Sequence, residues 1–228
     1  MASVKESTTI GEYQAFVAEV YGLPNSRYFS ASEMITNVER FIMRGLKGIR
    51  KEENERTTLN LLIAFSWFMS LMNQFHIDIE DEAWKRFPCL CSYCGDCPCS
   101  CAKHKAPVSR KVAVDESKHP KTMQDLQRMF EAIYPSGSRN IEHAGIHLAE
   151  EVGELSESML VYRGSHSDKD FEYVKHESAD LLSCFLGVFN SMGVSMAQAM
   201  AKMFSENCHV CKKAPCECNF AEVVKYKS

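Results

Sequence analysis

Apolar residues recur at helical spacing along nearly the whole chain. They fall three or four positions apart from Tyr13 to Met72 and again from residue 121 to residue 206, which is the pattern of amphipathic helices. No run alternates with a period of two for long enough to indicate a β-strand. The polar residues 105–120 separate the two halves as a linker. We therefore expect an all-α protein with four helices in each half, those of the second half covering residues 121–134, 140–163, 168–192 and 194–206.

The composition excludes several classes of protein. The 228 residues are 45% hydrophobic and 25% charged, as in a globular protein rather than a disordered chain. The net charge of -4 provides no basic field for a polynucleotide, so we do not expect a nucleic-acid partner. The longest apolar stretch, Leu59–Met72, covers 14 residues, whereas a membrane helix needs about 20. With no secretory signal at the N-terminus, the expected location is the cytoplasm, with no membrane partner.

The two halves resemble each other. Similar residues recur at offsets of 113 to 120, and the CxxC at Cys91–Cys94 returns at Cys208–Cys211, at the same distance from the preceding helix. We interpret the halves as tandem copies of one helical unit. The expected copies cover residues 8–104 and 121–218, and their cysteine-rich segments are residues 89–104 and 208–218.

Two pairs of carboxylates follow the apolar stripes of the second half. Glu151 and Glu154 share one helix flank, and Glu177 and Asp180 share a flank of the next helix. The stretch of helix from each pair to the intervening loop is roughly 13 Å long, at a rise of about 1.5 Å per residue. Because the two stretches are equally long, an antiparallel hairpin places the four carboxylates side by side. Clustered carboxylates need hard cations to offset their repulsion, and Mg²⁺ or Mn²⁺ fits best.

These residues resemble the signature of the MazG-like, all-α nucleoside triphosphate pyrophosphohydrolases, which is EExxE followed by ExxD. Here it reads Glu150-Glu151-Val152-Gly153-Glu154 and Glu177-Ser178-Ala179-Asp180, within residues 121–206. The resemblance implies that the four carboxylates bind Mg²⁺ and that a nucleoside triphosphate is cleaved between its α- and β-phosphates. Glu150 is a candidate to orient the attacking water. Lys202, which resembles a lysine of the family's last helix, and Arg163 are candidate substrate-binding residues.

The first half lacks this signature. Alignment places neutral or basic residues where the second half has carboxylates, so we expect no catalytic metal there. Because members of the family assemble as dimers or tetramers, the chain is expected to form an internal pseudo-dimer that itself could oligomerise. Arg40, Arg44 and Lys47 suit phosphate, and Trp67 suits a base. The first-half positions that align with the five signature carboxylates are Thr36, Asn37, Arg40, Thr57 and Asn60.

Ten of the eleven cysteines lie in two short windows. Each window contains CxxC followed by CxC, and four thiolates on a short loop suit structural Zn²⁺, although an iron–sulfur cluster has the same ligand count. The first window contains three further candidate ligands, Cys89, Cys101 and His104. They either form a second site or replace one of the expected ligands. The expected ligands are Cys91, Cys94, Cys97 and Cys99 in one window and Cys208, Cys211, Cys216 and Cys218 in the other.

The sequence thus predicts a Mg²⁺-dependent nucleotide pyrophosphohydrolase with added zinc sites, and it selects neither base nor sugar. The alternative is a zinc-stapled helical protein that binds a protein or nucleic acid and hydrolyses nothing. A di-iron carboxylate bundle ranks last, because neither carboxylate helix carries the ExxH motif of that class.

Overall fold

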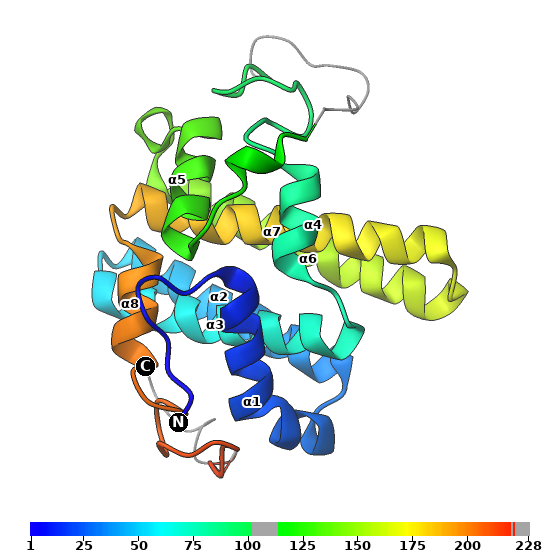
Figure 1. Ribbon diagram of the computed structural model, residues 1–228, viewed down its shortest axis with the longest axis vertical. Coiled ribbons are helices and arrows are strands. Elements are labelled where there is room, and N and C mark those ends of the chain that lie inside the picture. Colours follow the sequence, from blue (N-terminus) through cyan, green and yellow to red (C-terminus); the bar gives the residue numbers. More distant parts are fainter. Residues whose placement is uncertain (102–113, 220, 222–228) are drawn as a thin grey trace. The chain divides into compact units, whose positions relative to one another are not determined.

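The computed structural model describes residues 1–101, 114–219 and 221, and its regular structure is helical. These residues form no strand, so the predicted all-α class is confirmed. Two short 3₁₀ helices, η1 (Glu116–Lys118) and η2 (Ser136–Ser138), accompany the α-helices. The α-helices labelled in Figure 1 are α1 (Ile10–Tyr28), α2 (Ala31–Arg50), α3 (Asn54–Phe75), α4 (Ile79–Arg86), α5 (Met123–Ile133), α6 (Ile141–Ser165), α7 (Asp168–Ser191) and α8 (Met196–Met203).

Side-chain caps begin most of the long helices. Thr9 caps α1 and Ser30 caps α2, each in a reciprocal capping box with the glutamate three residues later. Thr122, Asn140 and Ser167 cap α5, α6 and α7 by accepting a hydrogen bond from the backbone N–H three residues on. Because these bonds are local, the helix boundaries expected for the second half lie within a few residues of those observed.

The first compact unit comprises Met1–Asp78 and the chain from Met196 onward. Helices α2 and α3 form an antiparallel hairpin, and α1 packs on α3. Phe204, which follows α8, packs against Tyr13 of α1 with ring centroids 5.8 Å apart, and Tyr13 stacks on Phe65 of α3 at 5.7 Å. All three rings are fully buried. The core of this unit therefore combines both ends of the chain.

The second compact unit comprises Ile79–Ser195. Helices α6 and α7 form a long hairpin, and α4 and α5 each pack on α7 (Figure 1). Trp84 of α4 is buried, as is Phe87, whose ring lies 5.2 Å from that of Phe130 in α5. Burial of these large rings, at about 1.5–3 kcal/mol each, holds α4 on the helices of the second half.

This division differs from the domains that the sequence suggested. The compact units separate after Asp78 and after Ser195, whereas we expected the boundary in the linker, residues 105–120. Helix α4 and the first cysteine window belong with α5–α7, while α8 and the second window belong with α1–α3. Residues 102–113, which include His104 and most of that linker, lie outside the described residues.

The same hydrogen bonds occur in both units. Gln14 donates to the carbonyl of Ile77 at 2.7 Å, and Gln127 donates to that of Val194 at 2.9 Å. Asn73 donates to the Gln14 carbonyl at 3.0 Å, and Asn190 to the Gln127 carbonyl at 3.1 Å. These pairs are 113 residues apart for the glutamines and 117 for the other partners.

The two cysteine windows also make equivalent contacts. The Cys99 N–H donates to the Ile133 carbonyl at 2.8 Å, and the Cys216 N–H donates to the Val20 carbonyl at 2.7 Å. The first window therefore attaches to α5 and the second to α1, and each of these helices comes from the other half of the chain but lies in the same compact unit as the window.

A search of the described helices for membrane spans finds none that is long and apolar enough alone. Helices α7 and α8, with a bend at the break between them, meet the length and composition criteria for a membrane span only when they are taken together.

Candidate functional site

The α6–α7 hairpin holds the predicted carboxylates. Residues His166 and Ser167 connect the helices, and near the turn the rings of Tyr162 and Phe171 lie 5.0 Å apart. Further along, Leu155 is one of the residues that form the fully buried stripe of α6. The stripe fixes the rotation of the helix, so the carboxylates on its flank face α7.

Three of the four carboxylates come together. Ligand oxygens of Glu151, Glu177 and Asp180 all lie within 4.8 Å of one another, and Asp180 is buried. One oxygen of Glu151, Oε2, is buried without a hydrogen-bond partner. Glu154 is exposed, and its charge acts on both Glu151 and Glu177. Hard oxygen donors with an unsatisfied buried lone pair fit a cation such as Mg²⁺ or Mn²⁺.

The electrostatics of the cluster favour such a cation. Burial, followed by the charge of Asp180, raises the pKa of Glu151 to about 8 and that of Glu177 to about 7. A divalent ion would relieve the repulsion that raises both pKa values, because each carboxylate would then face an opposite charge. The arrangement therefore suits metal binding at or above neutral pH.

Arg86 is a member of this site that the sequence analysis missed. From the end of α4 its Nε donates to Asp180 Oδ1 at 2.6 Å, and its second nitrogen, Nη2, bonds Asp180 Oδ2. Burial works to lower the pKa of Arg86, but this bidentate pair raises it overall. No local signal could have found Arg86, because it lies 94 residues from Asp180 and reaches it only through the packing of α4 on α7.

The first cysteine window borders the carboxylates as well. Asp180, Glu151 and Glu177 all contribute to a raised pKa of Tyr93, for which burial is the largest cause. Tyr93 lies inside the CxxC of this window. The window thus supplies a phenol to the edge of the carboxylate cluster.

Three other predicted site residues lie apart from the cluster. Glu150 is exposed, with His147 Nε2 at 3.8 Å from its Oε2. Arg163 is exposed in the last turn of α6, more than two turns from Glu154. Lys202 is exposed on α8, which belongs to the first compact unit, so it is not in the unit that holds the carboxylates.

The α2–α3 hairpin is closely packed near its turn. Gly45 lies against Leu61, and Gly48 lies against Thr57, where a Cβ on Gly48 would stand 2.3 Å from Thr57 Oγ1. Thr57 and Asn60 are buried, and each donates from its side chain to a carbonyl four residues back on α3, at 3.1 and 2.7 Å. The Thr57 hydroxyl also lies 3.5 Å from the Gly45 carbonyl on α2, so it links the two helices, whereas the Asn60 amide bonds its own helix.

The recurring hydrogen bonds and the helix N-caps give an alignment of the two hairpins that differs from the one expected from the sequence. The asparagine hydrogen bonds set the offset between α3 and α7 at 117, and the N-caps Ser30 and Asn140 indicate 110 for α2 and α6. At these offsets Gly48 and Thr57 correspond to Ser158 and Val174, which lie between the Tyr162–Phe171 contact and the carboxylates. The alignment expected from the sequence differs from this one by about one turn in each helix, a shift that preserves a pattern repeating about every 3.6 residues.

The corrected positions again carry no carboxylate. Counterparts of the five signature acids were expected at Thr36, Asn37, Arg40, Thr57 and Asn60. The residues that correspond to Glu150, Glu151, Glu154, Glu177 and Asp180 are Arg40, Phe41, Arg44, Asn60 and Ile63.

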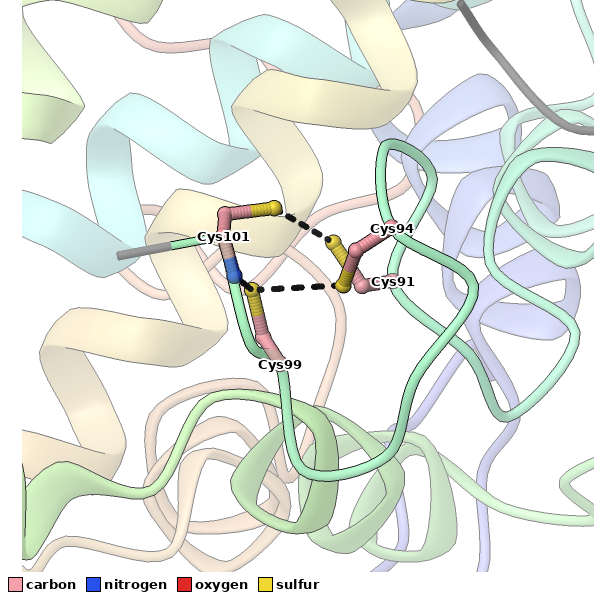
Figure 2. A group of neighbouring side chains, drawn as sticks. All are labelled: Cys91, Cys94, Cys99 and Cys101. Carbon is pink, nitrogen blue, oxygen red and sulfur yellow. Dashed lines mark hydrogen bonds between the residues drawn. The ribbon is translucent and has the colours of Figure 1, made fainter. Parts of the chain in front are cut away.

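Four thiols converge in the first cysteine window (Figure 2). The sulfurs of Cys91 and Cys101 lie 3.7 Å apart, and those of Cys94 and Cys99 lie 3.9 Å apart. Cys101 thus replaces Cys97, which we had expected as a ligand and which is exposed and outside this group. The sequence held a signal for this choice, because Cys91, Cys94, Cys99 and Cys101 have the same spacing as the four cysteines of the second window, at an offset of 117.

The second window matches the predicted ligand set. Cys208, Cys211, Cys216 and Cys218 place their sulfurs within 4.8 Å of one another. A hydrogen bond with Cys216 lowers the pKa of Cys208 to about 4, which favours the thiolate that binds metal. Both windows therefore have the four closely spaced sulfur donors of a tetrahedral Zn²⁺ site.

Comparison of the chain with protein-family models, with curated proteins and with solved structures finds no match.

Proposed function

We propose that the second compact unit is a divalent-metal-dependent nucleotide pyrophosphohydrolase of the MazG-like kind. The observation that carries this proposal is the convergence of Glu151, Glu177 and Asp180 across the α6–α7 hairpin, with two raised pKa values and one unpaired buried oxygen. The substrate is a ribo- or deoxynucleoside triphosphate, and the products are the monophosphate and pyrophosphate.

The roles of the residues follow from their places. Glu151, Glu177 and Asp180 would hold Mg²⁺ or Mn²⁺, with Glu154 as a further ligand from the exposed side. The ion supplies charge neutralisation at the phosphate oxygens and a more acidic water. Arg86 holds Asp180 in place through its two hydrogen bonds. We retain from the sequence the prediction that Glu150 orients the attacking water, although its exposed position apart from the cluster adds no support to that role.

The recurring hydrogen bonds support the further proposal that the chain is an internal pseudo-dimer. Two equivalent units, each completed by the last helix and cysteine window of the other half, are expected when a duplicated subunit exchanges its ends. Zn²⁺ in the two windows would be structural, because four sulfur donors leave no open position for a substrate.

A product assay tests the hydrolase. Purified protein with Mg²⁺ and a panel of nucleoside triphosphates should release monophosphate and pyrophosphate, as resolved by ion-exchange chromatography. We expect Glu151→Gln to lower the rate about 10²–10³-fold, the magnitude typical for loss of one group that stabilises charge in the transition state. The matched control is Glu157→Gln, which alters an exposed glutamate on the same helix and should leave the rate within twofold.

Two outcomes would reject the proposal. Release of diphosphate and phosphate would show a different reaction, and equal rates for the two variants would show that the carboxylate cluster takes no part. Absence of turnover with either metal would favour the alternative of a zinc-stapled binding protein, whose bundle is only a scaffold.

A further inference from the structure

Two arginines on α2 lie together in the first compact unit. Arg40 and Arg44 are one helical turn apart, and their guanidinium carbons lie 4.7 and 5.1 Å from the ring centroid of Phe41. Both side chains are half-buried. The shared ring therefore fixes two positive charges on one face of the helix.

These charges lack acceptors. Arg40 Nε and Nη2 and Arg44 Nη1 are buried without a hydrogen-bond partner, and within the described part of the chain neither side chain forms an ion pair. Burial, and then the charge of Arg44, lowers the pKa of Arg40. Partly desolvated like charges with unmade hydrogen bonds are unfavourable, so an anion that reached them would be stabilised.

The alignment of the two hairpins places these arginines at the positions of two carboxylates in the second unit. Arg40 and Arg44 correspond to Glu150 and Glu154, and Asn60 corresponds to Glu177. Asn60 is fully buried, and its Oδ1 has no hydrogen-bond partner. The positions that gather negative charge in the second unit thus gather positive charge in the first.

We propose that Arg40 and Arg44 bind the phosphate chain of a small anion, as in pyrophosphate or a nucleoside triphosphate. Guanidinium groups bind phosphate oxygens through paired N–H donors. Two of them one helical turn apart, with Cβ atoms about 5–6 Å from each other, suit an anion whose charge extends over adjacent groups. This site needs no metal, so it goes beyond the proposed hydrolase and does not depend on it.

The same helix offers a matched control. Arg50 ends α2 and Lys51 caps it, and both side chains are exposed. The double variant Arg50→Gln/Lys51→Gln removes as much positive charge as Arg40→Gln/Arg44→Gln does. Any effect of net charge alone is therefore equal in the two proteins.

Calorimetric titration tests the proposal. Sodium pyrophosphate is titrated into the zinc-loaded full chain in buffer without added Mg²⁺ or Mn²⁺ and without chelator, so that the carboxylate cluster is given no metal and repels the anion. We expect binding that Arg40→Gln/Arg44→Gln weakens at least tenfold and that Arg50→Gln/Lys51→Gln changes less than twofold. Glu151→Gln should bind pyrophosphate like the wild type even if it hydrolyses nothing, which separates this site from the hydrolase.

A second titration, with an α,β-methylene nucleoside triphosphate, distinguishes the two sources of the phosphate chain. Binding as tight as that of pyrophosphate would show that only the chain is recognised, and tighter binding would add a nucleoside contact to the same site. No binding of pyrophosphate, or equal loss in both double variants, would overturn the proposal.

The test does not depend on the stability of one variant. If Arg40→Gln/Arg44→Gln fails to fold, as judged by circular dichroism, the side-chain Nε–H resonances of the wild type give the answer. Pyrophosphate should shift the Nε–H signals of Arg40 and Arg44, assigned from the single variants Arg40→Lys and Arg44→Lys, while that of Arg50 stays. Unshifted signals for the first two would overturn the proposal.

Discussion

The α6–α7 and α2–α3 hairpins share an architecture and differ in what they hold. In α6–α7, carboxylates converge beside Asp180, and Arg86 balances part of their charge. In α2–α3, Asn60 bonds its own helix and two arginines stack on Phe41. The comparison shows that the same hairpin architecture can hold negative charge near its centre in one unit and positive charge in the other. An ion pair accompanies the charge in α6–α7, and packing on an aromatic ring accompanies it in α2–α3.

The largest effect should come from the cysteine windows. Replacing Cys94 by Ser removes one of four metal donors, and structural zinc sites contribute about 10 kcal/mol or more to folding. We expect bound zinc, measured by inductively coupled plasma mass spectrometry, to fall from two ions per chain to one and the second unit to unfold first. Cys97→Ser should retain both ions, and its failure to do so would restore Cys97 as a ligand in place of Cys101.

The Arg86–Asp180 pair can be exchanged for its counterpart in the first unit, Met203 and Ile63. Arg86→Met alone leaves Asp180 without its partner, and we expect a loss of about 3 kcal/mol in the free energy of unfolding. Adding Asp180→Ile should recover most of this loss and abolish Mg²⁺ binding. Urea denaturation and titration with Mn²⁺ measure the two effects, and a double variant no more stable than the single one would contradict the correspondence.

Close packing near the turn distinguishes α2–α3. Ala normally stabilises a helix by about 1 kcal/mol relative to Gly, but a Cβ at Gly48 would lie 3.1 Å from the Thr57 backbone nitrogen as well as against its hydroxyl. We expect Gly48→Ala to destabilise the protein by about 1–2 kcal/mol, as measured by urea denaturation. Ser158→Ala, at the corresponding place in α6, should change stability by less than about 0.5 kcal/mol; equal effects would refute the assigned register.

The smallest effect concerns pH. Because the pKa of Glu151 is raised to about 8 in the folded protein, its protonated form favours folding, and this contribution is complete below the unfolded value and lost as the pH rises through 8. Without added Mg²⁺ or Mn²⁺, and with zinc left in the cysteine windows, the melting temperature should therefore fall by a few degrees between pH 5 and pH 8.5, and less in Glu151→Gln. Added Mg²⁺ should reverse the fall at high pH; scanning fluorimetry would show whether it does.

Much of the fold could be read from local sequence. The caps at Thr122, Asn140 and Ser167 and the apolar stripes act within a turn or two, so the class and the helix boundaries of the second half were predictable. The i, i+3 carboxylate pairs were visible for the same reason, since spacing along a helix fixes which residues share a face. The ligands of the second cysteine window likewise lie within one short loop.

Contacts between distant segments were decided only by the tertiary structure. These include the packing of α4 on α7 and the approach of Arg86 to Asp180. The structure also decided which residues of α2–α3 correspond to those of α6–α7. The choice of Cys101 over Cys97, in contrast, was within reach of the sequence, because the second window repeats its spacing. An apolar stripe specifies that a helix is buried, but equivalent stripes in two similar halves accept either partner, and a one-turn shift preserves the pattern. Only the packing of complete side chains across the core distinguishes these alternatives, because it depends on the shape of both partners at once.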